Sequence, residues 1–213
     1  VCLRHLNQGW MRALFNSSPS YLVVKRVIDV LVVLLTLPLT LPLCAVIALA
    51  IKLDSPGPVL FLQQRVGQKG NPFWLVKFRS MRHEPESTEA RFTAPDDERI
   101  TRVGRWLRRY RLDELPQLWN VLRGEMSLIG PRPEQVAFAR QFEKEIPFYS
   151  WRYSVKPGIT GWAQVQQGYA SSTDETMIKL EYDLYYVKHL SIWLDLLIVA
   201  RTLTTILFGR GAR

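Results

Sequence analysis

Two adjacent carboxylates, Asp113 and Glu114, directly follow a run of arginines in the segment Arg108–Gln117. Proline is tolerated in the first turn of a helix, so Pro116 predicts a helix that begins here with Asp113 at its N-cap. Both carboxylates could then face one ligand, and the helix N-terminus favours bound phosphate. One carboxylate could attack phosphorus while the other holds Mg²⁺. Nearby arginines should lower the pKa of Asp113. An ordinary helix cap explains the same pair.

A second acidic cluster, Asp96-Asp97-Glu98, precedes a segment that is rich in arginine. Apolar residues recur there at helical spacing, which predicts a basic amphipathic helix over residues 99–111. We expect the acidic cluster to cap this helix, with a metal site as the alternative. The arginine face suits anionic headgroups or phosphates, and a solvated basic surface is the alternative.

Two further segments have compositions that suit anion binding. Gly130-Pro131-Arg132-Pro133 places an arginine between two prolines, which limits the entropy lost on clamping an anion. Lys156–Trp162 is a glycine-rich turn that begins with a basic residue. Either could be only a structural turn. The sequence contains neither a phosphate-binding loop of the Walker type nor a dinucleotide-binding glycine motif, so phosphate handling must rely on arginines and a metal.

The net charge of +9 and the sequence pI of about 9.8 imply an anionic partner. Nucleic acid, an anionic membrane and phosphorylated substrates all fit that charge. The segment Val30–Ile51 contains no charged residue, which favours a membrane. The two cysteines, Cys2 and Cys44, form neither a zinc motif nor a disulfide framework, which favours a reducing cytoplasmic compartment.

The apolar segment is long enough to cross a bilayer as one helix, at roughly 33 Å for its length. Pro38 and Pro42 near its middle predict a kink, and both of its flanks are basic. A helix that enters, breaks near Pro42 and leaves on the same face satisfies both features, so we favour a re-entrant helix over a spanning one. The hydroxyl of Thr40 is a candidate partner for the freed carbonyls.

The remaining patterns predict an α+β fold that is mostly helical. Short strands are expected over 59–63 and 73–78 with a turn at 67–71, and a surface loop over 83–97. The apolar stretch 194–208 favours an interfacial helix. The predicted organisation therefore has three parts. An N-terminal segment (1–24) is either an interfacial helix or the tail of a longer protein, and a re-entrant membrane helix (25–54) follows it. A cytoplasmic catalytic domain (55–213) carries interfacial amphipathic helices and a small β-hairpin, so the whole is a monotopic membrane protein.

The order of motifs resembles that of the small monotopic phosphoglycosyl transferases, also called bacterial sugar transferases. The matching segments, in chain order, are Lys25-Arg26 with Asp29, Ser55–Pro58, Gln64–Gly67, Lys77–Met81, Leu112–Leu118, Asn120–Leu122, Met126–Pro133, Pro157–Val165, Tyr182-Asp183 and Tyr186. This resemblance covers most of the chain, from about Lys25 to about Leu207. Taken together, the ordered matches favour chemistry over a simple cap at Asp113.

The resemblance implies that Asp113 attacks the β-phosphorus of a UDP-sugar, releases UMP and forms a covalent intermediate, which undecaprenyl phosphate then accepts. It implies that Glu114 holds Mg²⁺. It also implies that phosphates are bound by a set of basic residues: Arg108, Arg132, Lys77 and Arg79. The membrane helix is implied to break at Pro42, and catalysis to occur among membrane lipids at the cytoplasmic face of the bacterial inner membrane, in exopolysaccharide or lipopolysaccharide assembly. A homo-oligomer is compatible with this family.

The sequence departs from the family pattern at two positions. Leu41 precedes the helix-breaking proline where serine is frequent, and Gln166 stands where asparagine is usual. A different class of function, a non-catalytic basic adaptor at the membrane, would explain the charge and the interfacial helices without releasing UMP. A nucleic-acid binder is disfavoured by the apolar segment and by the absence of a recognised nucleic-acid motif.

Overall fold

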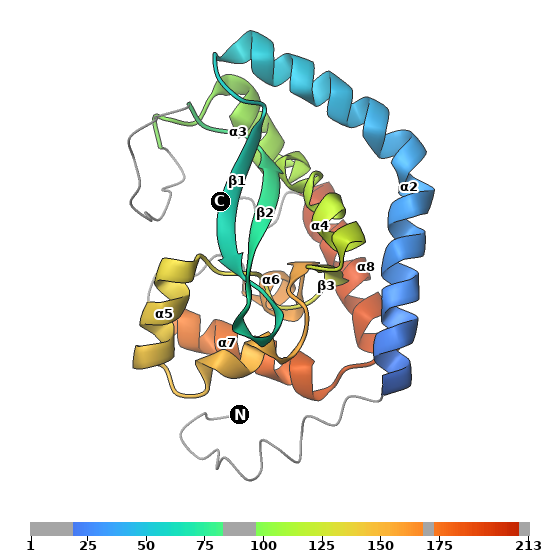
Figure 1. The fold of residues 1–213 in the computed structure, drawn as a ribbon, viewed down its shortest axis with the longest axis vertical. Helices are drawn as coiled ribbons and strands as arrows, with labels where there is room; N and C mark the ends of the chain where they lie inside the picture. The colour runs from blue at the N-terminus through green and yellow to red at the C-terminus, as the bar shows by residue number, and fades with distance from the viewer. Residues whose placement is uncertain (1–18, 83–96, 168–172, 209–213) are drawn as a thin grey trace.

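A computed structural model describes residues 19–82, 97–167 and 173–208, and Figure 1 shows the arrangement of their elements. The expected loop over 83–97, except Asp97, and the first eighteen residues lie outside the described residues. The elements are, in order, α2 (Pro19–Asp54), β1 (Leu60–Val66), η2 (Gln68–Gly70), β2 (Pro72–Phe78), α3 (Arg102–Arg109), η3 (Leu112–Glu114), α4 (Gln117–Arg123), β3 (Ser127–Ile129), α5 (Val136–Glu145), η4 (Tyr149–Ser154), β4 (Gly158–Thr160), α6 (Trp162–Gln166), α7 (Thr173–Lys188) and α8 (Ile192–Phe208). The mostly helical fold with a small hairpin is as predicted.

The long apolar helix α2 bends part-way along its length and curves around one side of the protein (Figure 1). Its helical assignment continues through Pro38 and Pro42, so the expected break at Pro42 takes the form of a bend within one helix. Each proline removes one backbone donor and its ring crowds the preceding turn, which explains the bend. The Thr40 hydroxyl donates to the Leu37 carbonyl at 3.4 Å rather than to a carbonyl that a proline frees.

The N-terminal half of α2 is fastened to the rest of the protein by polar contacts. Lys25 Nζ lies 2.8 Å from Asp195 Oδ2 on α8. Arg26 donates through Nη1 and Nη2 to the carbonyls of Val121 and Leu122 at the end of α4, where cations are favourable. The buried carboxylate of Asp29 accepts from the backbone N–H of Leu128 at 3.1 Å.

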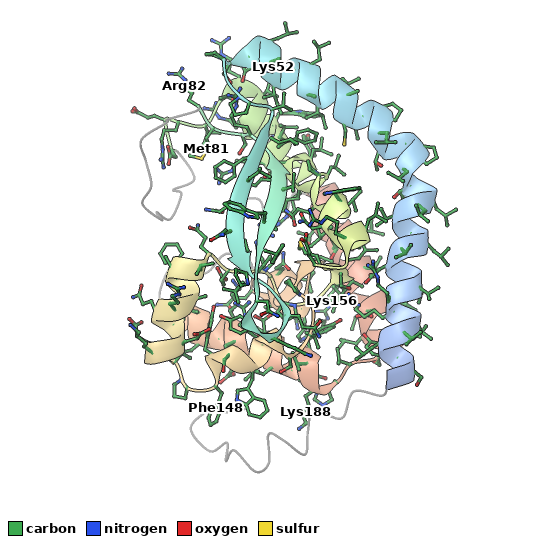
Figure 2. All side chains as sticks on the ribbon, in the orientation of Figure 1. Lys52, Met81, Arg82, Phe148, Lys156 and Lys188 are labelled. Carbon is green, nitrogen blue, oxygen red and sulfur yellow. The ribbon has the colours of Figure 1, made fainter. Side chains whose placement is uncertain are left out.

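The C-terminal half of α2 packs on the same body through apolar side chains. Ile47 and Ile51 form one core cluster with Phe78 and Leu107. Most of residues 34–46, between the two attached halves, are exposed. Figure 2 shows the side chains on the convex side of α2 pointing away from the rest of the protein. By length and composition, the helix over Ser20–Asp54 could cross a membrane.

The hairpin of β1 and β2 is antiparallel, with Leu62 opposite Val76, and matches the predicted strands within a few residues. A second, parallel pair, β3 with β4, is not apparent from the sequence pattern. Only glycine fits where these strands meet, because a Cβ added to Gly130 would lie 2.4 Å from the Lys156 carbonyl oxygen. The pair brings the Gly130–Pro133 segment beside the Lys156–Trp162 turn.

The basic helix α3 is shorter than predicted, and its cap differs from the expectation. Thr101, not the acidic cluster, is the N-cap, and its hydroxyl accepts from the backbone N–H of Gly104 at 2.9 Å. Asp97 instead pairs with Arg99 at 2.6 Å. A hydroxyl one residue before the helix can reach the backbone N–H of the third helical residue directly, which a carboxylate several residues upstream cannot.

Candidate active site

Asp113 and Glu114 lie on a short 3₁₀ turn, η3, that precedes α4. The expectation that Asp113 is an N-cap is wrong, because α4 begins only at Gln117 with Pro116 before it. Arg111 adopts a left-handed backbone conformation with a φ of 54° directly before the turn. The backbone N–H of Glu114 then donates to the Arg111 carbonyl at 3.3 Å. The chain therefore leaves α3 before the two carboxylates, which lie on a separate turn.

A pocket forms where η3, β2 and the segment after β3 meet. Its lining residues are Arg65, Leu75, Lys77, Asp113, Glu114, Gln117, Arg132 and Pro133. The structure therefore brings together four of the six residues that the sequence singled out. The strand β2 supplies Lys77, the turn supplies both carboxylates, and the proline-flanked segment supplies Arg132.

Glu114 is committed to an ion pair. Its Oε1 accepts from Arg132 Nη2 at 2.6 Å, and Arg111 Nη1 lies 3.8 Å from the same oxygen. Burial raises the pKa of Glu114, but the charge and hydrogen bond of Arg132, together with the charges of Arg111 and Lys77, outweigh burial and hold it below its ordinary value. Glu114 is therefore a permanent anion at neutral pH.

Asp113 behaves in the opposite way. Burial, and then the negative charge of Glu114, raise its pKa from 3.8 to about 6, although Lys77, Arg132 and Arg108 act against the rise. Arg132 and Arg108 do lower this pKa, as expected, but burial and the charge of Glu114 outweigh them, so the net shift is upward. Asp113 is thus an ionised carboxylate above about pH 6, and within the described residues it makes no close ion pair like the one that holds Glu114.

Lys77 complements this pair of carboxylates. Burial and the charge of Arg65 lower the pKa of Lys77 to about 8, while Asp113 and Glu114 oppose the fall. Between about pH 6 and pH 8, Asp113 is an anion and Lys77 a cation in the same pocket. That combination suits a nucleophile beside a phosphate-binding cation.

Two of the arginines expected at the site do not line the pocket, and one arginine that lines it was not predicted. Arg79 does not line the pocket, because it donates to the carbonyls of Ser55 and Pro56 at 2.7 and 2.5 Å and thereby holds the end of α2. Arg108 lies at the end of α3 and reaches the site through its charge, which lowers the pKa of Asp113. Arg65 lines the pocket, and its presence in the Gln64–Gly67 motif was the available signal.

The carboxylates form a partial donor set for a divalent cation. In the part of the chain that the structure describes, no three of the His, Cys, Asp and Glu side chains cluster as a metal site. Mg²⁺ characteristically binds one or two carboxylates together with substrate phosphates and waters. Asp113 and Glu114 fit that pattern, with Glu114 keeping one oxygen that Arg132 does not occupy.

The model of a family described as bacterial sugar transferase matches residues 20–209. The chain belongs to that family. It is 52% identical to the UDP-N-acetylgalactosamine-undecaprenyl-phosphate N-acetylgalactosaminephosphotransferase of Aeromonas hydrophila, over 100% of this chain and 50% of that protein. It is 45% identical to the UDP-glucose:undecaprenyl-phosphate glucose-1-phosphate transferase of Xanthomonas campestris pv. campestris, over 90% of this chain and 40% of that protein.

A third relative of this bacterial sugar transferase is similar to it in length, the exopolysaccharide production protein PSS of Rhizobium leguminosarum bv. phaseoli. It is 42% identical over 89% of this chain and 98% of that protein. The chain thus spans half or less of the first two relatives and nearly all of the third. The family match over residues 20–209 includes every residue that lines the pocket.

Proposed function

We propose that the chain is a phosphoglycosyl transferase that moves a sugar 1-phosphate from a UDP-sugar to undecaprenyl phosphate through a covalent intermediate on Asp113. The observation that carries the proposal is one pocket that holds two unlike carboxylates beside Lys77 and Arg132. The names of the relatives support the substrates.

In the first step, an oxygen of ionised Asp113 forms a bond to the phosphorus that carries the sugar. The bond from that phosphorus to the bridging oxygen breaks, and its electron pair leaves with UMP. In the second step, a phosphate oxygen of undecaprenyl phosphate attacks the same phosphorus. The aspartyl bond breaks, Asp113 is restored, and a polyprenyl diphosphate sugar is formed. No proton needs to move to either leaving group in these steps.

The other residues of the pocket would bind and neutralise the diphosphate. Arg132 and Lys77 present cations beside Asp113, and Arg108 adds charge from the end of α3. Glu114, with Asp113, would hold Mg²⁺, which supplies charge neutralisation at the transferring phosphoryl group. Glu114 also keeps Arg132 in place through the 2.6 Å ion pair.

We further propose that α2 is re-entrant and that the protein is monotopic, on the cytoplasmic face of the inner membrane. A straight helix of 36 residues extends about 54 Å, which would carry its ends to opposite faces of a bilayer. Here both ends pack on one body while the apolar middle protrudes, which favours a helix that returns to the face it entered. Trp193, which is 79% exposed on α8, suits the headgroup region of that face.

Single cysteines can test on which side of the membrane each end of α2 lies. In a variant without native cysteines, Ser20→Cys and Pro56→Cys place thiols at the two ends of α2. A membrane-impermeant maleimide should label both from the same side of sealed inner-membrane vesicles. Labelling from opposite sides would show a spanning helix instead.

The reaction is testable with purified protein, Mg²⁺, undecaprenyl phosphate and a panel of UDP-sugars that includes UDP-N-acetylgalactosamine and UDP-glucose. UMP release is expected with at least one donor. Without undecaprenyl phosphate, labelled UMP should exchange into the donor, because the first step is reversible and needs no acceptor. Asp113→Asn should abolish release and exchange, whereas Asp97→Asn, a control in the other acidic cluster, should retain both. Release that survives in Asp113→Asn would refute this nucleophile, and a lack of UMP with every donor would favour the adaptor.

A further inference from the structure

Arg152 is an arginine outside the pocket with almost no exposed surface. It lies in η4, is 3% exposed, and its charge is met mainly by Asp183 of α7, which is 1% exposed. Both Nε and Nη2 of Arg152 donate to Asp183 Oδ2, at 3.0 and 2.6 Å. Nη1 donates to the Tyr149 hydroxyl at 2.8 Å. A buried ion pair of this kind seldom makes a protein more stable than apolar packing would, so stability alone does not explain the Arg152–Asp183 pair.

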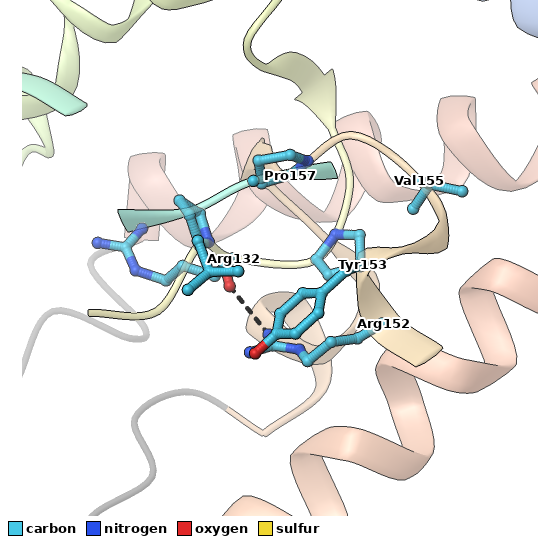
Figure 3. Close-up of a pocket in the computed structure, with 9 residues that line it drawn as sticks. Arg132, Arg152, Tyr153, Val155 and Pro157 are labelled. Atoms are coloured by element: carbon cyan, nitrogen blue, oxygen red, sulfur yellow. Dashed lines mark hydrogen bonds between the residues drawn. The ribbon is translucent and has the colours of Figure 1, made fainter. Parts of the chain in front are cut away.

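The same guanidinium reaches the segment that carries Arg132. Arg152 Nη2 donates to the backbone carbonyl of Arg132 at 2.9 Å, as Figure 3 shows by a dashed line. From the other side, Arg65 Nη1 donates to the carbonyl of Pro133 at 3.1 Å. Two guanidinium groups thus hold two consecutive carbonyls of one short segment.

This segment has little freedom left. Pro131 and Pro133 have fixed φ angles on either side of Arg132. With its carbonyl also held, the Arg132 backbone can shift little, and the side chain reaches Glu114 Oε1 at 2.6 Å. A chain of contacts therefore runs from Asp183 through Arg152 and Arg132 to the reacting carboxylates.

We propose that the buried Arg152–Asp183 pair is a positioning element for the reaction, which holds the Arg132 backbone so that its guanidinium stays on Glu114 and beside Asp113. The inference rests on the proposed function, because it assigns a role within that reaction. Neither residue touches the pocket carboxylates, so both act through Arg132.

Loosening this tether has a local consequence that a general loss of stability lacks. If the Arg132 backbone shifts, its guanidinium leaves the 2.6 Å contact with Glu114 Oε1, and a cation of the pocket is displaced from its place beside Asp113. Turnover should then fall at temperatures where the variant is still folded, and the η3 turn that carries both carboxylates should become more mobile.

The test compares Arg152→Lys and Asp183→Asn with the wild-type chain. A lysine at position 152 keeps the charge, but one ammonium lacks the planar fork that reaches Asp183, Tyr149 and the Arg132 carbonyl together. The matched control is Tyr21→Phe, because the Tyr21 hydroxyl on α2 donates to Asp195 Oδ2 at 2.8 Å, so the variant removes one partly buried hydrogen bond outside the contacts of Arg152 and Arg132.

Initial rates of UMP release are measured at several donor concentrations, at a temperature well below the unfolding midpoint of every variant. We expect Arg152→Lys and Asp183→Asn to lower kcat/KM for the donor at least ten-fold relative to wild type. Tyr21→Phe should lower the melting temperature and leave kcat/KM unchanged.

Hydrogen exchange of the peptide over Leu112–Leu118 gives a readout that needs no turnover. Faster exchange in Arg152→Lys but not in Tyr21→Phe supports the tether, even if the wild-type chain releases no UMP and the proposed function fails. Unchanged exchange together with an unchanged kcat/KM in an active enzyme would overturn the proposal. If both primary variants fail to fold, Tyr149→Phe, which removes only one contact of Arg152, takes their place with the same expected directions.

Discussion

Asp113→Asn is expected to inactivate the protein and at the same time to stabilise its fold. Burial and Glu114 raise the pKa of Asp113 from 3.8 to about 6, so its charged form is less stable in the folded protein than in the unfolded chain. One pKa unit corresponds to about 1.4 kcal/mol, which puts the cost of this charge at about 3 kcal/mol above pH 6. Asparagine has similar shape and carries no charge, so the variant should avoid most of that cost.

The sign of the pH dependence follows from the same shift. Between about pH 4 and pH 6 the folded protein binds the Asp113 proton more tightly than the unfolded chain does. The contribution of Asp113 to wild-type stability therefore falls as the pH rises through this window, and the gain from Asp113→Asn should grow over it and then level off. Below about pH 4 both proteins carry a neutral group there, so the gain should vanish.

Glu114→Gln is the matched control, with the opposite sign. The pKa of Glu114 is held below its ordinary value of 4.5 by Arg132, so its charge stabilises the fold above that pH. Glutamine removes this charge and leaves Arg132 without its anion. Two neighbouring carboxylates should thus respond in opposite directions to the loss of charge.

Thermal unfolding in one detergent from pH 4 to pH 8 measures both variants. For a chain of this length, a gain of about 3 kcal/mol corresponds to a rise in Tm of roughly 6–12 °C. Equal or lower Tm for Asp113→Asn at pH 8 would contradict the assigned burial and charge at this site. A gain of the same size at every pH would show that it arises from something other than ionisation.

Three further predictions concern how the site is held, each measured by thermal unfolding. The Asn120 side chain accepts from the Val76 N–H at 3.1 Å and donates to the Trp74 carbonyl, both on β2. Asn120→Ala leaves these two backbone groups unpaired and should destabilise the protein by about 2–4 kcal/mol, which an unchanged Tm would contradict. Gly104→Ala should cost more than about 2 kcal/mol, since its Cβ would lie 1.9 Å from the Ser80 carbonyl oxygen; a well-folded variant would show that α3 can move away. Thr101→Ala should cost about 1 kcal/mol through loss of the α3 cap, and Thr101→Ser should restore it, whereas equal stability of both would exclude the cap.

Local patterns predicted the elements that depend on local physics. The hairpin followed from alternating strand residues with a turn at Gly67–Asn71, and the bend of α2 from Pro38 and Pro42. The cap of α3 was predicted one turn too early, because the acidic cluster and Thr101 are both suitable caps and only the backbone geometry selects between them.

The amino-acid sequence by itself determined the two carboxylates of the pocket, the apolar helix and most of the cations, because an acidic pair, an uncharged segment and ordered motifs are visible in one dimension. Tertiary structure alone decided what each charge does. In the folded protein Arg132 pairs with Glu114, and the pKa of Asp113 is raised. Arg79 donates to the segment that follows α2, and Arg65 lines the pocket. The physical reason is that pKa values and ion pairs depend on burial and on distances of a few ångströms between residues that are far apart in the chain.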